Sequence, residues 1–286
     1  MPLDLAHAGN ADQIAYWNGP SGRRWTARQD MQDAVFAPIS DRLYARAHFA
    51  PGQSVIDVGC GCGATTLDIA RRIAPNGSAI GVDVSEPMIG RARERAPADG
   101  GPEFLLADAT TYDFAPEAAD LLFSRFGVMF FADPVLAFAN MRKGLKRGGR
   151  VAFACWREPK LNPWQTVSLK AACKHVPRLP DAAPDAPGPF SFADPVRLHG
   201  ILEAAGYDRI ALTPIDIDLD LAAGRGFEAG FTTALEVGAA SRAMDGQPEA
   251  SRAAAAEEIR AALAPYQRGP SLPLGAAIWI VEAVNP

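Results

Sequence analysis

Residues 55–63 read VIDVGCGCG and join a short run of β-branched residues to a glycine-rich turn. The helix-like residues 64–73 follow the turn directly. Glycines at such a turn let a ligand approach the backbone closely at the N-terminus of a helix. Asp57 stands two residues before the first glycine, and we expect it near the carboxyl end of the strand. A carboxylate there favours a cationic, hydrogen-bond-donating ligand and repels the pyrophosphate of a dinucleotide.

On both sides of the turn, apolar runs alternate with helical periodicity from about residue 53 to residue 156. This alternation is typical of βαβ units on a parallel sheet. We predict strands at 53–58, 78–84, 103–107, 120–124 and 150–156, and helices at 64–74, 86–96 and 134–145. Ser85 is the expected N-cap of the second of these helices, and Gly148-Gly149 the expected stop after the third. The pattern indicates an α/β fold of the Rossmann-like kind.

The flanking segments are expected to extend this domain. Residues 1–50 form a predicted N-terminal helical extension, with an amphipathic helix at 28–48 bent near Pro38. Residues 51–286 then form one domain. Helices are predicted at 164–175 and 194–205, and strands at 207–221 and 276–284 that pair at one sheet edge. We interpret 157–195 and 222–273 as substrate-pocket or lid insertions, the latter holding two helices separated by residues 245–248.

Composition narrows the class of protein. The 286 residues are 48% hydrophobic, enough for a buried core, and the net charge of -5 argues against a nucleic-acid partner. Residues 1–10 do not resemble a signal peptide, and no stretch reaches the ~20 apolar residues of a membrane span. Four cysteines do not make a disulfide scaffold. We therefore expect a soluble cytoplasmic protein, and we make no prediction of its oligomeric state.

Further polar residues end the next predicted strands. Asp83 ends the second strand, 24 residues after Gly59, where a carboxylate can accept hydrogen bonds from both ribose hydroxyls. Asp108 ends the third strand, where it could accept an adenine amino proton, and Ser124-Arg125 follows the fourth. The carboxyl ends of parallel strands form the ligand-binding edge of an open α/β sheet. These side chains are therefore expected around one crevice.

With these motifs the chain resembles the class I S-adenosylmethionine-dependent methyltransferases, particularly the small-molecule group that includes the ubiquinone/menaquinone-type enzymes. The resemblance covers residues 10–156, and Tyr16-Trp17-Asn18-Gly19-Pro20 with Arg23 and Trp25 is also similar to a segment of this group. It is strongest at 57–63, 81–88, 106–109, 124–131 and 145–151. It implies a mostly parallel seven-stranded sheet with an antiparallel edge strand, helices on both faces, an N-terminal helical extension and a C-terminal lid insertion.

The resemblance also implies a methyl donor, S-adenosyl-L-methionine, and its product, S-adenosyl-L-homocysteine. Gly59, Cys60 and Gly61 would lie against the methionine moiety, with Asp57 ordering water or the amine nearby. Ser124 and Arg125 would lie beside the sulfonium.

The same resemblance implies the contacts of the nucleoside. Asp83 would hold the ribose, and Val84 and Met88 would enclose the adenine. Asp108 would accept from adenine N6, and the N–H of Ala109 would donate to N1. Trp17 and Trp25 are as well explained by a small hydrophobic cap as by a cover over the cofactor.

Two other functions remain open from the sequence. Gly59-x-Gly61-x-x-Ala64 also fits a permissive dinucleotide pattern, so an NAD(P)-dependent oxidoreductase is the first alternative. Asp57 in the strand and the lack of a Tyr-x-x-x-Lys pair argue against it. The second alternative is a catalytically silent module that keeps the cofactor fold for binding.

The methyl acceptor is expected to be a small, apolar or aromatic molecule, because the insertion at 222–273 is apolar and alanine-rich. Whether its accepting atom is C, N or O is not predicted. No catalytic residue is assigned, and His175, His199 and Tyr207 are only nominal candidates for a base. His7 and His48 have no predicted partner.

Two further patterns have simple structural interpretations. Cys60 and Cys62 stand among glycines with no cluster of ligands nearby, so no metal site is predicted. Phe227, Phe231 and Leu235 recur at four-residue spacing, which indicates a helix face packed on a core more than a lid over the substrate.

Overall fold

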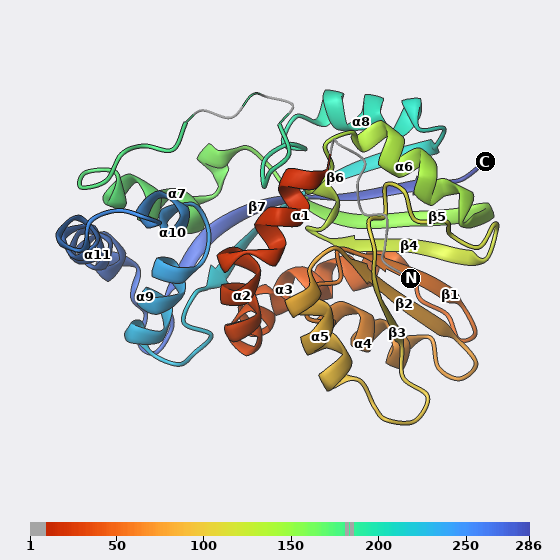
Figure 1. Ribbon diagram of the computed structural model, residues 1–286, viewed down its shortest axis with the longest axis horizontal. Helices are drawn as coiled ribbons and strands as arrows, with labels where there is room; N and C mark the ends of the chain where they lie inside the picture. Colours follow the sequence, from red (N-terminus) through yellow and green to blue (C-terminus); the bar gives the residue numbers. More distant parts are fainter. Residues whose placement is uncertain (1–9, 181–182, 184–185) are drawn as a thin grey trace.

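The computed structural model describes residues 10–180, 183 and 186–286 (Figure 1). Its centre is a seven-stranded sheet in the order β3-β2-β1-β4-β5-β7-β6. The strands are β1 Ser54–Val58, β2 Ser78–Asp83, β3 Glu103–Leu106, β4 Ala119–Arg125, β5 Leu145–Trp156, β6 Asp208–Asp220 and β7 Pro273–Val284. The predicted strands all form, with ends that shift by a few residues at most, except that β5 begins five residues early.

The predicted fold class is confirmed, and the structure places its antiparallel strand. Strand β7 runs antiparallel to both β5 and β6, and the other neighbouring pairs are parallel. The antiparallel strand therefore lies one position in from the edge, which β6 forms. The order reverses beside β1, because the chain goes outward to β2 and β3 and then returns to β4 on the other side of β1. Such a switch point opens a crevice at the carboxyl ends of the strands.

Helices cover both faces of the sheet. Figure 1 shows α3 (Gln29–Ala47), α4 (Ala64–Arg72) and α5 (Glu86–Arg95) on one side, with α6 (Pro134–Lys143) and α8 (Pro195–Ala204) on the other. The α3 helix contains Pro38, as predicted, and its apolar positions are fully buried at Ile39 and Leu43. The large side chains of Phe123, Phe138 and Phe153 fill the core between the layers. Each helix thus buries one stripe against the sheet.

The remaining helices surround the crevice. Ahead of α3 lie α1 (Ala11–Asn18) and α2 (Pro20–Ala27). After β5 comes α7 (Pro163–Ala172), and between β6 and β7 come α9 (Phe227–Glu236), α10 (Ala239–Met244) and α11 (Glu249–Leu263). Figure 1 shows α7, α9, α10 and α11 gathered beyond the end of the sheet, beside α2. In the part of the chain that is described, no helix is long and apolar enough to cross a membrane.

Two local predictions are wrong, and a third is confirmed in position only. Residues 222–273 hold three helices instead of two, because Val237 is extended and Gly238 has a φ of 88°, which divides α9 from α10. The helix α6 ends before Gly144, and Gly148-Gly149 lies inside β5. Ser85 is the N-cap residue of α5, as predicted, although its hydroxyl donates to the carbonyl oxygen of Trp17 and makes no capping hydrogen bond.

Candidate active site

The glycine turn after β1 touches the loop after β4 backbone to backbone. Gly59 has a φ of +66°, and a Cβ atom built on it would lie 2.4 Å from the Cα of Gly127. The side chain of Ser124, fully buried, holds this crossing together. Its Oγ donates to the carbonyl oxygen of Val58 at 2.7 Å and accepts from the N–H of Gly127 at 3.1 Å. Ser124 therefore joins the two loops and does not line the cavity that they border.

The carboxylate of Asp83 shapes the same turn from the end of β2. Its Oδ2 accepts from the N–H of Gly61 at 2.8 Å, and its Oδ1 accepts from the N–H of Ser85 at 2.9 Å. Burial raises the pKa of Asp83 above its usual value, and the backbone N–H groups oppose that shift. Because a carboxylate oxygen can accept two hydrogen bonds, each oxygen keeps acceptor capacity for a ligand. Asp83 lines the cavity beside Gly61, whose open side only Met88 approaches.

Asp57 turns away from the cavity and into the N-terminal turn of α4. Its Oδ2 accepts from the hydroxyls of Thr65 and Thr66 at 2.6 and 2.7 Å, while its buried Oδ1 has no partner among the described residues. The side chain is not part of the cavity lining. Burial raises the pKa of Asp57 to about 6, although both threonine hydroxyls oppose the shift. Asp57 therefore does not line the cavity, where a direct contact with a ligand was expected. It supports the glycine turn through the hydroxyls of Thr65 and Thr66 instead.

The raised pKa of Asp57 predicts a pH dependence of stability. The folded chain binds this proton more tightly than the unfolded chain, so stability is lost as the pH rises from about 4 through 6. We expect the free energy of unfolding of the wild type to fall by roughly 1–3 kcal/mol relative to Asp57→Asn between pH 4 and pH 7. Urea unfolding of both proteins across this range measures the difference. Parallel curves would show that Asp57 does not titrate in this window.

At the end of β3, Asp108 is held by the N-terminal helices. It is 2% exposed; its Oδ2 accepts from Nδ2 of Asn10 at 3.0 Å, and its Oδ1 from the N–H of Thr110 at 2.9 Å. Asn18 on α1 likewise donates to the carbonyl oxygen of Val84 at 2.8 Å. Sequence reasoning missed Asn10 and Asn18, because nothing in the linear order indicates that α1 crosses the ends of β2 and β3.

One open cavity joins these elements, and it holds about 1600 Å³ counted out to its mouth. Ten of the twelve predicted site residues line it, all except Asp57 and Ser124: Trp25, Gly59, Cys60, Gly61, Asp83, Val84, Met88, Asp108, Ala109 and Arg125. The structure thus gathers the strand-end residues at one place, as the sequence predicted.

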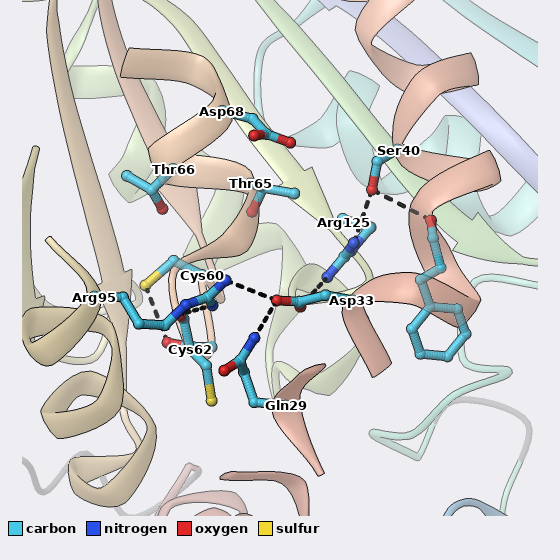
Figure 2. A network of polar contacts seen from close by, with 12 residues as sticks. Gln29, Asp33, Ser40, Cys60, Cys62, Thr65, Thr66, Asp68, Arg95 and Arg125 are labelled. Carbon is cyan, nitrogen blue, oxygen red and sulfur yellow. Dashed lines mark hydrogen bonds and ion pairs between the residues drawn. The ribbon is translucent and has the colours of Figure 1, made fainter. Parts of the chain in front are cut away.

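A polar network supports the cavity from the side of α3 (Figure 2). Asp33 pairs with Arg95 at 2.8 Å, and Arg95 donates to the carbonyl oxygen of Cys62 in the glycine turn. Arg125 donates from Nη1 to Ser40 Oγ at 2.7 Å and lies 4.0 Å from Asp33. The guanidinium of Arg125 is therefore anchored to α3. Asp33, which the sequence did not single out, connects α3, α5 and the turn.

Aromatic side chains form another part of the cavity wall. Phe126 stacks on Trp156 with ring centroids 4.1 Å apart, and Trp164 lies 4.9 Å from Trp156. Phe36 contacts all three rings and stacks on Trp25 at 6.1 Å. These five residues line the cavity, and we call them the aromatic wall. They come from five separate elements, namely α2, α3, the loop after β4, β5 and α7, so no local pattern could reveal them.

Comparison with known proteins shows what this part of the chain is similar to. Residues 55–149 match the family model described as a methyltransferase domain. The matched part includes the glycine turn, Asp83, Asp108 and the loop after β4.

Two curated relatives of the chain are methyltransferases by their names. An aklanonic acid methyltransferase of Streptomyces sp. (strain C5) is 33% identical over 120 residues, which are 41% of this chain and 54% of that protein. A nocamycin O-methyltransferase of Saccharothrix syringae is 27% identical over 195 residues, 64% of this chain and 69% of that protein. The chain thus spans about half of the first relative's length.

A solved structure shows the same fold for the domain. The phosphoethanolamine N-methyltransferase 2 of Haemonchus contortus, solved with S-adenosylhomocysteine, superposes with a TM-score of 0.59. The match covers 100% of this chain and 61% of that one, at 16% identity. At this identity the likeness concerns the fold alone.

The nominal base candidates lie outside the cavity of the methyltransferase domain. Tyr207 is buried and donates to the carbonyl oxygen of Phe138 at 3.1 Å, and burial raises its pKa. His175 lies 3.8 Å from Glu258, and neither it nor His199 lines the cavity. His7 falls outside the described residues. No histidine lines the cavity in the described ranges.

The structure also places the Phe227–Phe231 pattern and the two cysteines of the glycine turn. Phe231 is buried and Phe227 packs beside it at 6.4 Å; neither lines the cavity, which agrees with the core interpretation. Cys60 and Cys62 are both buried, and the described residues contain no group of three or more ligands that could hold a metal.

Proposed function

We propose that this protein transfers a methyl group from S-adenosyl-L-methionine to a small organic acceptor, releasing S-adenosyl-L-homocysteine. The observation that carries the proposal is that Asp83, Asp108 and the open side of Gly61 border one cavity within a methyltransferase domain. The residues present fit the donor. Asp83 keeps free acceptor capacity, and a Cβ atom built on Gly61 would meet nothing nearer than Met88 Sδ at 3.7 Å.

The proposed contacts of the donor follow from this arrangement. Asp83 accepts from the ribose hydroxyls, and Val84 and Met88 enclose the adenine ring. Asp108 accepts from the adenine amino group, and the N–H of Ala109 donates to the ring. The tie from Asn10 to Asp108 keeps that carboxylate oriented.

At the methionine end, Gly59, Cys60 and Gly61 present their backbone, and Asp57 supports them through Thr65 and Thr66. Arg125 contributes positive charge beside Asp33, and Ser124 acts by keeping the loop after β4 against the turn. Trp25 covers this end as part of the aromatic wall.

Methyl transfer requires little acid–base chemistry from the protein. When bound, the donor supplies an activated methyl group on a sulfonium, which is a good leaving group. The chain aligns the acceptor with the methyl group and excludes water. The aromatic wall and the covering helices α1, α2 and α10 serve this exclusion. Of the described residues, 10–50 then act as a cap, and the segments 157–180, 186–195 and 222–273 build the acceptor side.

Ligand-dependent stabilisation tests the proposal and separates it from the dinucleotide alternative. We expect S-adenosylhomocysteine at 100 times its dissociation constant to stabilise the protein by about 2.7 kcal/mol, seen as a rise of a few degrees in Tm. NADH at the same concentration serves as the control and is expected to leave Tm unchanged. The opposite pattern, protection by NADH alone, would contradict the proposal. Binding of S-adenosylhomocysteine without methyl transfer to any of a broad acceptor panel would favour the silent module.

A further inference from the structure

The far end of the cavity, beyond the aromatic wall, is built by α7 and α10. Trp164 and Gln165 line it from the first turn of α7, and Val237, Gly238, Ser241 and Arg242 line it from the loop before α10 and from α10 itself. These residues lie outside the part of the chain that matches the family model. The proposed donor contacts use none of them.

The start of α7 is held rigidly in place. Asn162, fully buried, donates from Nδ2 to the carbonyl oxygens of Arg157 and Glu158, each at 3.1 Å. Its Oδ1 accepts from the N–H of Ala277 on β7 at 2.9 Å. A side chain on the following turn is therefore presented in a defined position, as a preorganised site requires.

Gln165 is an unsatisfied amide at this position. The residue is 6% exposed, and its Oε1 is buried without a partner among the described residues. Its Nε2 is not fully buried, and it makes no hydrogen bond within the described part of the chain. Oε1 is closed off from the cavity, so only the N–H groups of Nε2 are free to donate to a ligand there.

Arg242 faces the same region from α10. A Cβ atom built on Gly238, the N-cap residue of α10, would lie 3.9 Å from Cγ of Gln165. Arg242 lies on α10 itself and lines the same cavity as Gln165. The half-buried Arg242 lines the cavity, and its guanidinium has no hydrogen bond or ion pair to any described residue.

The neighbouring arginines are different, because they are neutralised. Arg24 pairs with Asp245 at 2.8 Å, and Arg28 pairs with Glu236. The carboxylates that line the cavity, Asp33, Asp83 and Asp108, come from α3 and from the ends of β2 and β3. The described residues of α7 and α10 add none to the lining. The charge of Arg242 is therefore uncompensated at this end.

We propose that this end of the cavity binds an acceptor with an aromatic body and an oxyanion group, with a carboxylate as the best fit. The proposal rests on the proposed function. The aromatic body packs on Trp156 and Trp164, and Arg242 pairs with the oxyanion. A planar guanidinium matches a carboxylate in a bidentate geometry, and the Nε2 of Gln165 supplies a further donor. A basic, unpaired site of this kind rejects cationic acceptors.

Binding of matched aromatic probes tests this assignment. Titration calorimetry in saturating S-adenosylhomocysteine compares 2-naphthoate with the isosteric, neutral 2-naphthamide. We expect the wild type to bind 2-naphthoate at least about tenfold more tightly, as one charge-assisted pair provides. Arg242→Met should remove this preference, and Arg242→Lys, which keeps the charge without the bidentate geometry, should retain part of it. Arg252→Met, an exposed arginine of α11 outside the cavity, is the matched control and should keep the full preference.

The outcomes separate the two proposals. Equal affinity of the wild type for both probes, or no binding of 2-naphthoate, overturns the assignment of Arg242. A tenfold loss of S-adenosylhomocysteine affinity in Arg242→Met also overturns it, because the guanidinium then serves the carboxylate of the cofactor. If the wild type does not bind S-adenosylhomocysteine at all, the proposed function fails. The preference for 2-naphthoate, measured without it, still decides the role of Arg242.

Discussion

Asp83→Ala is expected to raise the dissociation constant for S-adenosylhomocysteine about 100-fold, which corresponds to about 2.7 kcal/mol. Two losses add together. The ribose hydroxyls lose their proposed acceptor, and the N–H groups of Gly61 and Ser85 lose the carboxylate that orders the turn. A carboxylate that accepts backbone hydrogen bonds at a buried turn contributes more than an exposed one, because the groups left behind stay unsatisfied.

Calorimetry with two control variants measures this effect. Asp113→Ala removes an exposed carboxylate that does not line the cavity and should leave the dissociation constant unchanged. Asp83→Asn keeps one acceptor oxygen and should fall between the wild type and Asp83→Ala. If Asp83→Ala binds as tightly as the wild type, Asp83 does not hold the ribose.

Gly127→Ala should lower the free energy of unfolding by about 3 kcal/mol or more, the largest stability effect we expect of a single methyl group. Its Cβ atom would lie 2.5 Å from the carbonyl oxygen of Val58 and 2.6 Å from the Cα of Gly59. Both are backbone atoms, so no side chain can rotate to make room. The loop after β4 would have to leave the glycine turn, and the hydrogen bonds of Ser124 would break with it.

Urea unfolding with Gly200→Ala as the control tests this prediction. Gly200 lies inside α8, and a Cβ atom built on it would meet nothing within 4 Å. Alanine there should stabilise the helix by about 0.5–1 kcal/mol. The two variants add the same group with opposite expected signs. Equal stability of Gly127→Ala and the wild type would show that the two loops do not depend on their close approach.

Local patterns predicted much of this fold because they report short-range physics. The strands around Ile56, Val82 and Leu122 consist of β-branched or apolar residues. Both faces of these strands are buried, so each strand can be recognised in the sequence as a continuous hydrophobic run. The helix breaks that were missed depend on context. Gly148-Gly149 is a plausible helix stop, but pairing of Leu145 with Ala119 starts β5 five residues before the predicted position. Tertiary pairing overrides such a local signal.

The residues of the candidate site were likewise predictable from the sequence only in part. Asp83 and Asp108 were found because residues at the carboxyl ends of parallel strands must meet at one edge, whatever the details of packing. Asp57 and Ser124 stand at similar positions, yet their side chains form hydrogen bonds within the protein. Asp57 accepts from Thr65 and Thr66, and Ser124 donates to the carbonyl oxygen of Val58. The direction of a side chain at a strand end is set by its partners, and the linear order does not contain them.

The stretch at residues 55–63, with the acids that end the next two strands, by itself determined the α/β fold and the edge at which a ligand binds. These features follow from the periodicity of the chain and from the requirement that parallel strands end together. Only the tertiary structure decided what surrounds that edge: the aromatic wall, the ties of Asn10 and Asp33, and Arg242, which has no partner among the described residues and lines the same cavity as Gln165. These residues meet through the packing of separate elements, which no local pattern in the chain specifies.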